Sequence, residues 1–480
     1  MNAKQNALCT IDKEAPLFRN LSDAIWDNPE TCYLEKKSAA LQIQALRELG
    51  FTVEENLAGI PTAFSGRFGS GKPVIGLLGE FDALSGLSQK ADVAVQEPIT
   101  PGAPGHGCGH NLLGTAAIAA AAAVKSYLEA GHPGTVIYYG CPAEEGGSGK
   151  AFMARDGVFD ELDCALTWHP GDTNVTPICS SLANCQISYH FKGIAAHAAG
   201  APHLGRSALD AVELMNVGVQ FLREHIIPEA RVHYAITNSG GYSPNVVQPT
   251  ADVLYLIRAP KTPQVQEIYE RVNNIARGAA LMTDTQVEIT FIKACSNIVP
   301  NTVLSELMQK NMEELGAPSY TEPEVEAAYA IAATYADRAE SPEGILRNLS
   351  PADAKATRAK LNGPIYDCVI PLAQRETVMP GSSDVGDVSW VCPTAQISAV
   401  TQAAGTPGHS WQLVAQGKSS IAHKGMLFAA KVMAASAIDL LEDPAAVQQA
   451  RDELADRLDH KPFVSPIPKD VIPQAIGMKQ

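Results

Sequence analysis

Two histidines and a cysteine lie within one short stretch, from Gly105 to Asn111, and only glycines separate them. Glycine permits a tight, positive-φ backbone, so a short loop of this kind can direct several side chains toward one point. Imidazole nitrogen and thiolate sulfur are ligands of borderline-soft divalent metals. The stretch therefore predicts a metal site that includes Cys108 and His110.

Further polar side chains follow apolar runs elsewhere in the chain. The adjacent carboxylates Glu144 and Glu145 come shortly after one run, His169 comes directly after another, and His409 lies in a glycine-containing loop. Burial of two unpaired carboxylates would cost several kcal/mol each. We therefore expect divalent cations to compensate their charge.

Together these side chains predict a site for two divalent metal ions, with ligands Cys108, His110, Glu145, His169 and His409. In such sites the ions lie roughly 3.5–4 Å apart, share a bridging hydroxide and polarise the scissile carbonyl. Glu144 is the predicted general base, which takes a proton from water and passes it to the leaving nitrogen. The predicted chemistry is hydrolysis of an amide bond.

Two other interpretations use the same residues. A cysteine hydrolase with Cys108 as nucleophile needs a base beside the thiol, and no candidate base is separable from the predicted ligands. A protein that only binds amino-acid conjugates, or supports a related subunit, is the second alternative. The complete ligand set argues against it.

The elements that must position these side chains indicate an α/β fold. Apolar, β-branched runs at 73–78, 135–140 and 165–168 are typical of strands buried on both faces of a sheet. Helical spacing separates them, notably from Leu112 to Tyr127. This alternation predicts a parallel-rich mixed sheet with right-handed crossovers. Ligands of such sheets gather beyond the carboxyl ends of the strands, where the predicted site residues lie.

The pattern changes near residue 184. Predicted strands and helices then follow in the order β-α-β-β-α-β, which resembles a ferredoxin-like unit with an antiparallel sheet. We expect three parts: a discontinuous metal-binding domain at 1–183 and 297–446, an inserted domain at 184–296, and a C-terminal tail at 447–480 that is only partly ordered. Within the first of these, Ala15 to Trp26 has helical spacing, and Gly381 to Asp387 is expected to be a turn-rich loop.

Composition excludes several classes of protein. The chain has 480 residues, 46% of them hydrophobic and 18% charged, and its net charge is −16, which argues against nucleic acid and anionic membranes as partners. The first 20 residues lack a signal-peptide core, and the apolar run from Leu112 to Val124 is too short to span a bilayer. Ten cysteines without paired spacing favour a cytoplasmic location.

From about Leu17 to Leu441 the sequence resembles the M20 metallopeptidase family, in the amidohydrolase branch that cleaves N-acyl and N-aroyl amino acids. The matching motifs are Gly79 to Leu84, His106 to His110, Pro142 to Gly146, Thr167 to Pro170, Phe191 to His197, Ser382 to Trp390 and Gly405 to His409. The resemblance implies that the two ions are manganese or zinc, and that the ligands and base are those given above.

The resemblance also implies roles for the inserted domain, as a lid that pairs with its twin in a dimer. His197 would reach the active site of the partner subunit and stabilise the oxyanion. Asn245 and Arg258 would hold the substrate carboxylate, Arg258 by a bidentate pair. The partner is either a second copy of this chain or a related subunit.

The chain departs from the family pattern at two positions. Much of the family has His-x-Asp after the first strand, whereas this chain has Glu80 and Asp82. We expect Asp82 to orient a ligand rather than to bind an ion. Asn111 replaces an aspartate, which removes one charge.

The expected reaction is metal-dependent hydrolysis of the amide between a p-aminobenzoyl group and glutamate. The alternatives are hydrolysis of other N-acyl amino acids or dipeptides, and a partner subunit with little activity alone.

Overall fold

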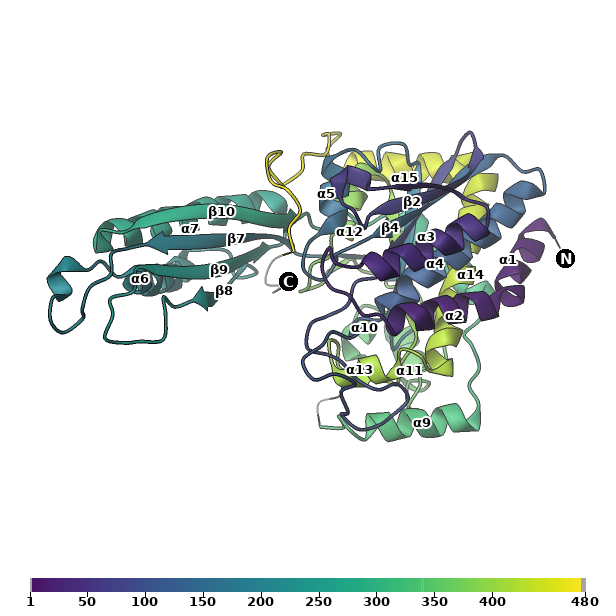
Figure 1. The fold of residues 1–480 in the computed structure, drawn as a ribbon. Coiled ribbons are helices and arrows are strands. Elements are labelled where there is room, and N and C mark those ends of the chain that lie inside the picture. Colours follow the sequence, from purple (N-terminus) through teal and green to yellow (C-terminus); the bar gives the residue numbers. More distant parts are fainter. Residues whose placement is uncertain (1, 338, 340, 476–480) are drawn as a thin grey trace.

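The computed structural model describes residues 2–337, 339 and 341–475. In this part of the chain the strands form a six-stranded sheet, a four-stranded sheet and a short two-stranded sheet. Figure 1 shows that the four-stranded sheet and its two helices project from a larger body of helices around the six-stranded sheet.

The six-stranded sheet has the strand order β1-β2-β4-β3-β5-β12. β4, β3, β5 and β12 are mutually parallel, whereas β2 is antiparallel to both β1 and β4. This arrangement confirms the predicted α/β fold with a parallel-rich mixed sheet. The strands are β1 (Thr52–Glu55), β2 (Phe64–Ser70), β3 (Val74–Glu80), β4 (Gly134–Cys141), β5 (Cys164–Gly171) and β12 (Thr394–Val400).

Successive residues of a strand point to opposite faces of the sheet, and both faces of this sheet carry apolar side chains. Helices therefore cover both faces. On one face lie α1 (Ala3–Lys13), α2 (Ala15–Trp26), α3 (Lys36–Glu48), α4 (His110–Glu129), α8 (Thr302–Leu315) and α14 (Ser420–Glu442). On the other lie α5 (Gly149–Arg155) and α12 (Val385–Val391). The other elements of the larger body include the 3-10 helix η1 (Leu57–Gly59), β6 (Cys179–Ser180), α9 (Glu322–Ala332), α10 (Glu343–Leu346), α11 (Pro351–Arg358), β11 (Thr377–Val378), α13 (Trp411–Gln416) and α15 (Pro444–Arg457).

Helix α4 is the central helix of the larger body. Nearly all of its residues are buried, and alanine is the most frequent of them, so the helix packs closely against β3 and α14. It extends the apolar run of 112–124 to 20 residues, which makes it long and apolar enough to span a membrane by length and composition. However, 89% of the apolar window is buried inside the protein, as in the core helix of a folded domain.

The four-stranded sheet has the order β10-β7-β9-β8 and is antiparallel throughout. Its elements are β7 (Ala183–Lys192), α6 (Ala208–Leu222), β8 (Arg231–Asn238), β9 (Thr250–Ala259), α7 (Thr262–Thr283) and β10 (Gln286–Cys295). The pairing of Asn184 with Cys295 places both connections to the larger body at one end. Lys192 and Gln286 pair at the opposite, distal end.

Two segments differ from the sequence-based expectations. The expected loop of 381–387 is only partly a loop, because α12 begins at Val385 and buries Val385 and Val388. The expected boundary of the C-terminal tail falls inside α15, which begins after Asp443. The carboxylate of Asp443 caps α15 by accepting backbone N–H bonds, and Leu454 is among the residues the helix buries.

Candidate metal and active site

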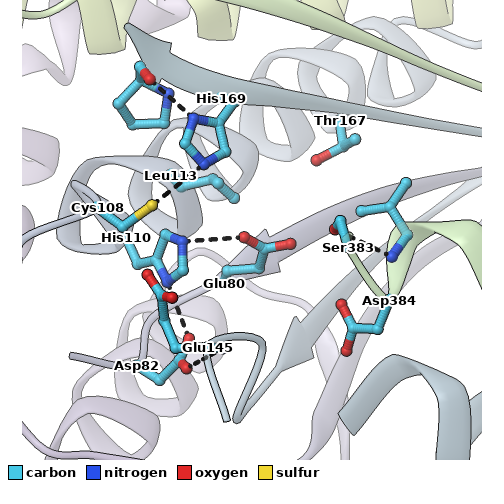
Figure 2. A network of polar contacts seen from close by, with 12 residues as sticks. Glu80, Asp82, Cys108, His110, Leu113, Glu145, Thr167, His169, Ser383 and Asp384 are labelled. Atoms are coloured by element: carbon cyan, nitrogen blue, oxygen red, sulfur yellow. Dashed lines mark hydrogen bonds and ion pairs between the residues drawn. The ribbon is translucent and has the colours of Figure 1, made fainter. Parts of the chain in front are cut away.

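The carboxyl ends of β3, β4, β5 and β12 meet at one edge of the six-stranded sheet, and polar side chains gather there (Figure 2). Glu80 is the last residue of β3, and the turn of residues 142–148 follows β4. His169 lies near the end of β5, and His409 lies in the loop after β12. These are the positions expected from the sequence, since parallel strands point their carboxyl ends the same way.

Cys108 and His110 enter the site from the N-terminus of α4. Gly109 precedes the helix with φ +76°, a conformation that glycine adopts without strain. A Cβ on Gly109 would lie 2.9 Å from Cβ of Pro170, so the loop passes close to β5. The thiol of Cys108 thus lies 3.4 Å from Nε2 of His169.

The predicted ligands form two groups that share Cys108. One consists of Cys108, His110 and His169, the other of Cys108, Glu145 and His409, and the ligand atoms of each group lie within 4.8 Å of one another. Nitrogen, sulfur and carboxylate oxygen together suit a borderline divalent ion such as zinc. The structure therefore brings all five predicted ligands into an arrangement that could hold two ions.

Two buried atoms point to the same conclusion. Nε2 of His110 and Oε1 of Glu145 form no hydrogen bond with any described residue. Nε2 of His110 lies 3.3 Å from Oε2 of Glu80, and Oε1 of Glu145 lies 3.3 Å from Nε2 of His409. Neither pair has the geometry of a hydrogen bond. Unsatisfied buried polar atoms are rare in folded proteins, and a cation between these pairs would satisfy them.

Neighbouring groups fix the orientation of the ligands. Oδ1 of Asp82 lies 2.9 Å from Nδ1 of His110, and Oδ2 accepts a 2.9 Å hydrogen bond from the backbone N–H of Glu145. Nδ1 of His169 lies 2.8 Å from the carbonyl oxygen of Pro170. Donation from each Nδ1 leaves the Nε2 lone pair directed at the cluster. Asp82 thus contacts ligands, as expected of an orienting residue.

The thiol of Cys108 has the electrostatics of a thiolate. Burial alone would raise its pKa, but His169 and His110 outweigh burial and hold the pKa well below its usual value. His409 interacts in return with Cys108 and Glu145, which raises the pKa of that imidazole to about 10. Thiolate is the form of cysteine that binds metals.

Glu144 is surrounded by negative charge. Burial raises the pKa of its carboxyl well above the usual value, and Glu80, Asp384 and Glu145 raise it further. A carboxylate with a raised pKa binds a proton more readily, as a general base at neutral pH requires. Oxygen atoms of Glu144, Glu80 and a nitrogen of His110 lie within 4.8 Å of one another, so Glu144 is at the ligand cluster.

Lys150 belongs to the site although no sequence motif marks it. Its ammonium is fully buried and lies 2.7 Å from Oε1 of Glu80 and 2.6 Å from Oδ1 of Asp384. A buried cation between two carboxylates offsets part of their mutual repulsion. Lysine on a helix is usually solvated, so the sequence carried no signal for this role.

Two N-terminal residues, Tyr33 and Glu35, hold the turn that carries Glu144. Oε1 of Glu35 accepts hydrogen bonds from the backbone N–H groups of Tyr33 (2.9 Å) and Ala143 (3.0 Å). The hydroxyl of Tyr33 donates to the carbonyl oxygen of Gly147 at 2.8 Å. Burial and the charge of Asp82 raise the pKa of Glu35 to about 8. Sequence analysis missed both residues.

Asn111 does not face the ligand cluster. Its amide donates to Oγ of Ser22 at 3.0 Å and to the carbonyl oxygen of Gly417 at 3.1 Å. Both partners lie behind α4 in the core. The side chain at position 111 therefore bonds to groups outside the predicted ligand set.

The small domain is the part of the chain from β7 to β10 that contains the four-stranded sheet. The predicted catalytic residue His197 and the predicted substrate-binding residues Asn245 and Arg258 lie at two different ends of it. Arg258 pairs with Asn184 at the end near the larger body, and its Nη1 donates to Oγ of Ser382 at 3.0 Å. His197 and Asn245 lie in neighbouring loops beyond Lys192, joined by a backbone bond from Ala198 to Asn245. β7 spans 10 residues, or roughly 30 Å. The structure thus does not bring His197 and Asn245 to the ligand cluster of their own chain.

Comparison with known proteins gives one matching family. The profile of peptidase family M20/M25/M40 matches residues 76–360. The chain is 52% identical over 477 residues to the B-type subunit of p-aminobenzoyl-glutamate hydrolase from Escherichia coli K12, covering 97% of this chain and 98% of that protein. It is 28% identical to the A-type subunit of the hydrolase from the same organism, over 56% of this chain and 62% of that protein.

A solved structure shares the fold. A dinuclear metal-binding peptidase of the M20 family from Bacillus subtilis superposes with a TM-score of 0.53 at 15% identity, covering 89% of this chain and 99% of that one. Its fold therefore extends over both the six-stranded and the four-stranded sheet of the present chain.

Proposed function

The chain belongs to peptidase family M20/M25/M40, and from this premise we propose that it hydrolyses the amide bond of p-aminobenzoyl-glutamate to p-aminobenzoate and glutamate. The family and the similarity to the B-type subunit support hydrolysis of an amide bond. The substrate is the one in the name of that relative. The observation that carries the proposal is the pair of ligand groups that share Cys108.

We propose manganese or zinc for the two ions, held by Cys108, His110, Glu145, His169 and His409. When bound, two such ions would polarise the scissile carbonyl and lower the pKa of the attacking water. The sulfur and imidazole ligands favour zinc, and the carboxylate of Glu145 accommodates manganese. Asp82 would keep His110 in the tautomer that offers Nε2.

Proton transfer falls to Glu144. Its raised pKa lets the carboxylate take a proton as water attacks the carbonyl carbon. The protonated carboxyl then delivers that proton to the amide nitrogen, so that the C–N bond breaks and the amine leaves. Because the buried cation Lys150 offsets the charge of Glu80 and Asp384, Glu144 can be ionised in this crowded cluster.

Arg258 and Asn245 are the proposed binding residues for the glutamate carboxylate, and His197 is the proposed oxyanion donor. Nδ1 of His197 accepts hydrogen bonds from the backbone N–H groups of Ala199 and Gly200, which leaves Nε2 as an outward N–H donor. His197 and Asn245 lie at the distal end of the small domain. We therefore propose that they serve the site of a partner subunit, either a second copy or a related chain.

The test is turnover of p-aminobenzoyl-glutamate beside hippurate and a β-alanyl dipeptide, with Mn²⁺-loaded and chelated enzyme. We expect the aroyl-glutamate to be preferred and chelation to abolish hydrolysis. Glu144→Gln should keep its metal content, measured by elemental analysis, while kcat falls by about 10²–10⁴-fold. Equal turnover by chelated and metal-restored enzyme would overturn the proposed mechanism.

The same panel separates the alternatives. Preference for hippurate or the dipeptide would assign another N-acyl amino acid as substrate with the same site. Activity that requires a second, related chain would assign this protein as one subunit of a two-chain enzyme, as the names of the two Escherichia coli relatives suggest for those proteins.

A further inference from the structure

Helix α12 and the loop before it, residues 382–391, lie between the ligand cluster and the linker through which the chain leaves the small domain. This linker, residues 296–299, follows β10 directly. The sequence motif from Ser382 to Trp390 has no role in the proposed reaction. Its side chains nevertheless contact Lys150 beside the ligand cluster on one side and the linker on the other.

On the side of the ligand cluster, the ammonium of Lys150 forms ion pairs with both Asp384 and Glu80. Oδ2 of Asp384 accepts the backbone N–H of Lys150 at 2.8 Å, and Oδ1 lies 2.6 Å from its ammonium. The same ammonium lies 2.7 Å from Oε1 of Glu80, whose Oε2 is 3.3 Å from Nε2 of His110. Figure 2 shows Asp384, Glu80 and His110 in this sequence across the site. All these groups are buried, so movement of one charge would leave the others unpaired.

On the linker side, three side chains of α12 bind the backbone of residues 296–299. Asp387 accepts two hydrogen bonds of 2.9 Å, from the N–H and from Oγ of Ser296. Oγ of Ser389 accepts the N–H of Val299 at 2.8 Å, and Nε1 of Trp390 donates to the carbonyl oxygen of Asn297 at 2.8 Å. Side chains of α12 therefore hold Ser296, Asn297 and Val299 of the linker in place.

Close packing leaves α12 no room to shift against the linker. A Cβ on Gly386 would lie only 2.0 Å from the carbonyl oxygen of Ser296, so the two backbones are in direct contact. At the start of the same segment, Ser382 accepts a hydrogen bond from Arg258 of the small domain. Segment 382–391 thus contacts the small domain through both β9 and the linker.

We propose that Lys150, Asp384 and Asp387 are positioning residues through which α12 couples metal binding at His110 to the order of the linker of the small domain. The coupling rests on the proposed metal site. It goes beyond that site because Asp387 bonds to the linker residue Ser296 rather than to a predicted metal ligand. Coupling of this kind is reciprocal: a change at the linker alters metal affinity, and metal binding alters the linker.

The first experiment is titration of metal-free, full-length protein with Mn²⁺ by calorimetry. In Asp387→Asn the amide can accept only one of the two bonds from Ser296. We expect Mn²⁺ affinity to fall about tenfold, within the range typical of coupled sites. Ser296→Ala, which removes only the hydroxyl bond, should cause a smaller loss and serves if Asp387→Asn does not fold.

The matched control is Asp163→Asn. Asp163 is also buried, accepts a backbone N–H bond of 2.7 Å from Val74, and pairs with Arg451 at 2.7 Å. It lies at the amino end of β5, away from the ligand cluster. We expect Asp163→Asn to lower Tm without changing Mn²⁺ affinity, which separates coupling from loss of stability.

The second experiment is hydrogen exchange at the amides of Ser296 and Val299 with and without Mn²⁺. Exchange should slow on metal addition in the unmodified chain and stay unchanged in Asp384→Asn, which breaks the metal side only. Equal Mn²⁺ affinity in Asp387→Asn and the unmodified chain, or equal slowing in Asp384→Asn, would overturn the coupling. Failure of the unmodified chain to bind either Mn²⁺ or Zn²⁺ would instead overturn the proposed function.

Discussion

Cys108 is the residue on which the site depends most, because it belongs to both ligand groups. His169 and His110 stabilise its thiolate, and Gly109 gives the loop the conformation that directs the sulfur toward β5. Burial has the opposite effect on other thiols, since it raises the pKa of Cys141 and Cys392 to about 12. Cys108 differs from these two in having a lowered pKa and imidazole neighbours.

Replacement of the shared ligand should affect both ions. We expect Cys108→Ser to weaken Mn²⁺ or Zn²⁺ binding by more than the roughly 10–100-fold that loss of an orienting partner costs, and to abolish turnover. Elemental analysis after dialysis would show less than the full metal content. Cys179→Ser, at a half-buried thiol whose pKa is raised to about 11, is the control. Full metal content in Cys108→Ser would remove Cys108 from the ligand set.

Individual site residues differ in how far the sequence reveals them. Cys108 and His110 were recognisable because glycines separate them and no apolar residue there can pack. Lys150 was not, since its partners Glu80 and Asp384 are 70 and 234 residues away in the chain. A buried ion pair between distant segments leaves no local pattern, because only the fold brings its members together.

The turn of residues 142–148 is an element whose conformation needs external support. Ala143 and Ser148 have φ of +62° and +57°, and such a backbone costs a non-glycine residue about 1–2 kcal/mol. Glu35 holds the first end of the turn and Tyr33 the second. The N-terminal segment therefore helps to place Glu144.

Loss of the tyrosine hydroxyl should slow catalysis without affecting substrate binding. We expect Tyr33→Phe to lower kcat about tenfold at unchanged KM, since small misplacements of catalytic groups cost up to about 10²-fold. Tm should fall by the few degrees that one hydrogen bond of about 1 kcal/mol implies. Tyr127→Phe, which removes a 2.7 Å bond to Glu442, is the control and should leave kcat unchanged. An equal kcat in both variants would contradict support of the turn by Tyr33.

Elements with a full amphipathic pattern were predictable. The helix expected at 15–26 is α2 with the same bounds. α12 was missed because its seven residues are too few for a helical period to stand out after a serine-rich turn. α15 was expected as a tail because its sequence is polar overall, but Val447, Ala450 and Leu454 bury one face.

At the scale of the whole molecule, the small domain carries His197 and Asn245 far from their own ligand cluster. The sequence predicted the strands and helices of this domain but not its placement, because bonds such as those of Asp387 to the linker involve distant segments. β8 is an edge strand, and Tyr234 and Ile236 on it are exposed. An unpaired edge with exposed apolar residues is typical of a surface that binds another chain.

Complementation between inactive variants tests whether His197 serves a partner. We expect His197→Ala and Glu144→Gln each to be inactive alone, and their co-expression to restore roughly a quarter of full activity, because half of the randomly formed dimers contain one complete site. Co-expression of Glu144→Gln with Cys108→Ser should restore no activity. Each of these residues acts in the site of the chain that carries it, so neither site of a mixed dimer is complete. No recovery in the first pair, despite dimers seen by light scattering, would place His197 outside the reaction.

The alanine-rich packing of α4 has a consequence for divergence among relatives. The helix has 20 residues, roughly 30 Å of rigid rod, and a Cβ on Gly114 would already meet the carbonyl oxygen of Glu80 at 2.7 Å. A bulkier residue packed against the buried face of α4 would tilt the helix, and the tilt would displace Cys108 and His110 at its N-terminus. Evolution can therefore retune metal geometry by volume changes in the interior, with every coordinating residue left untouched.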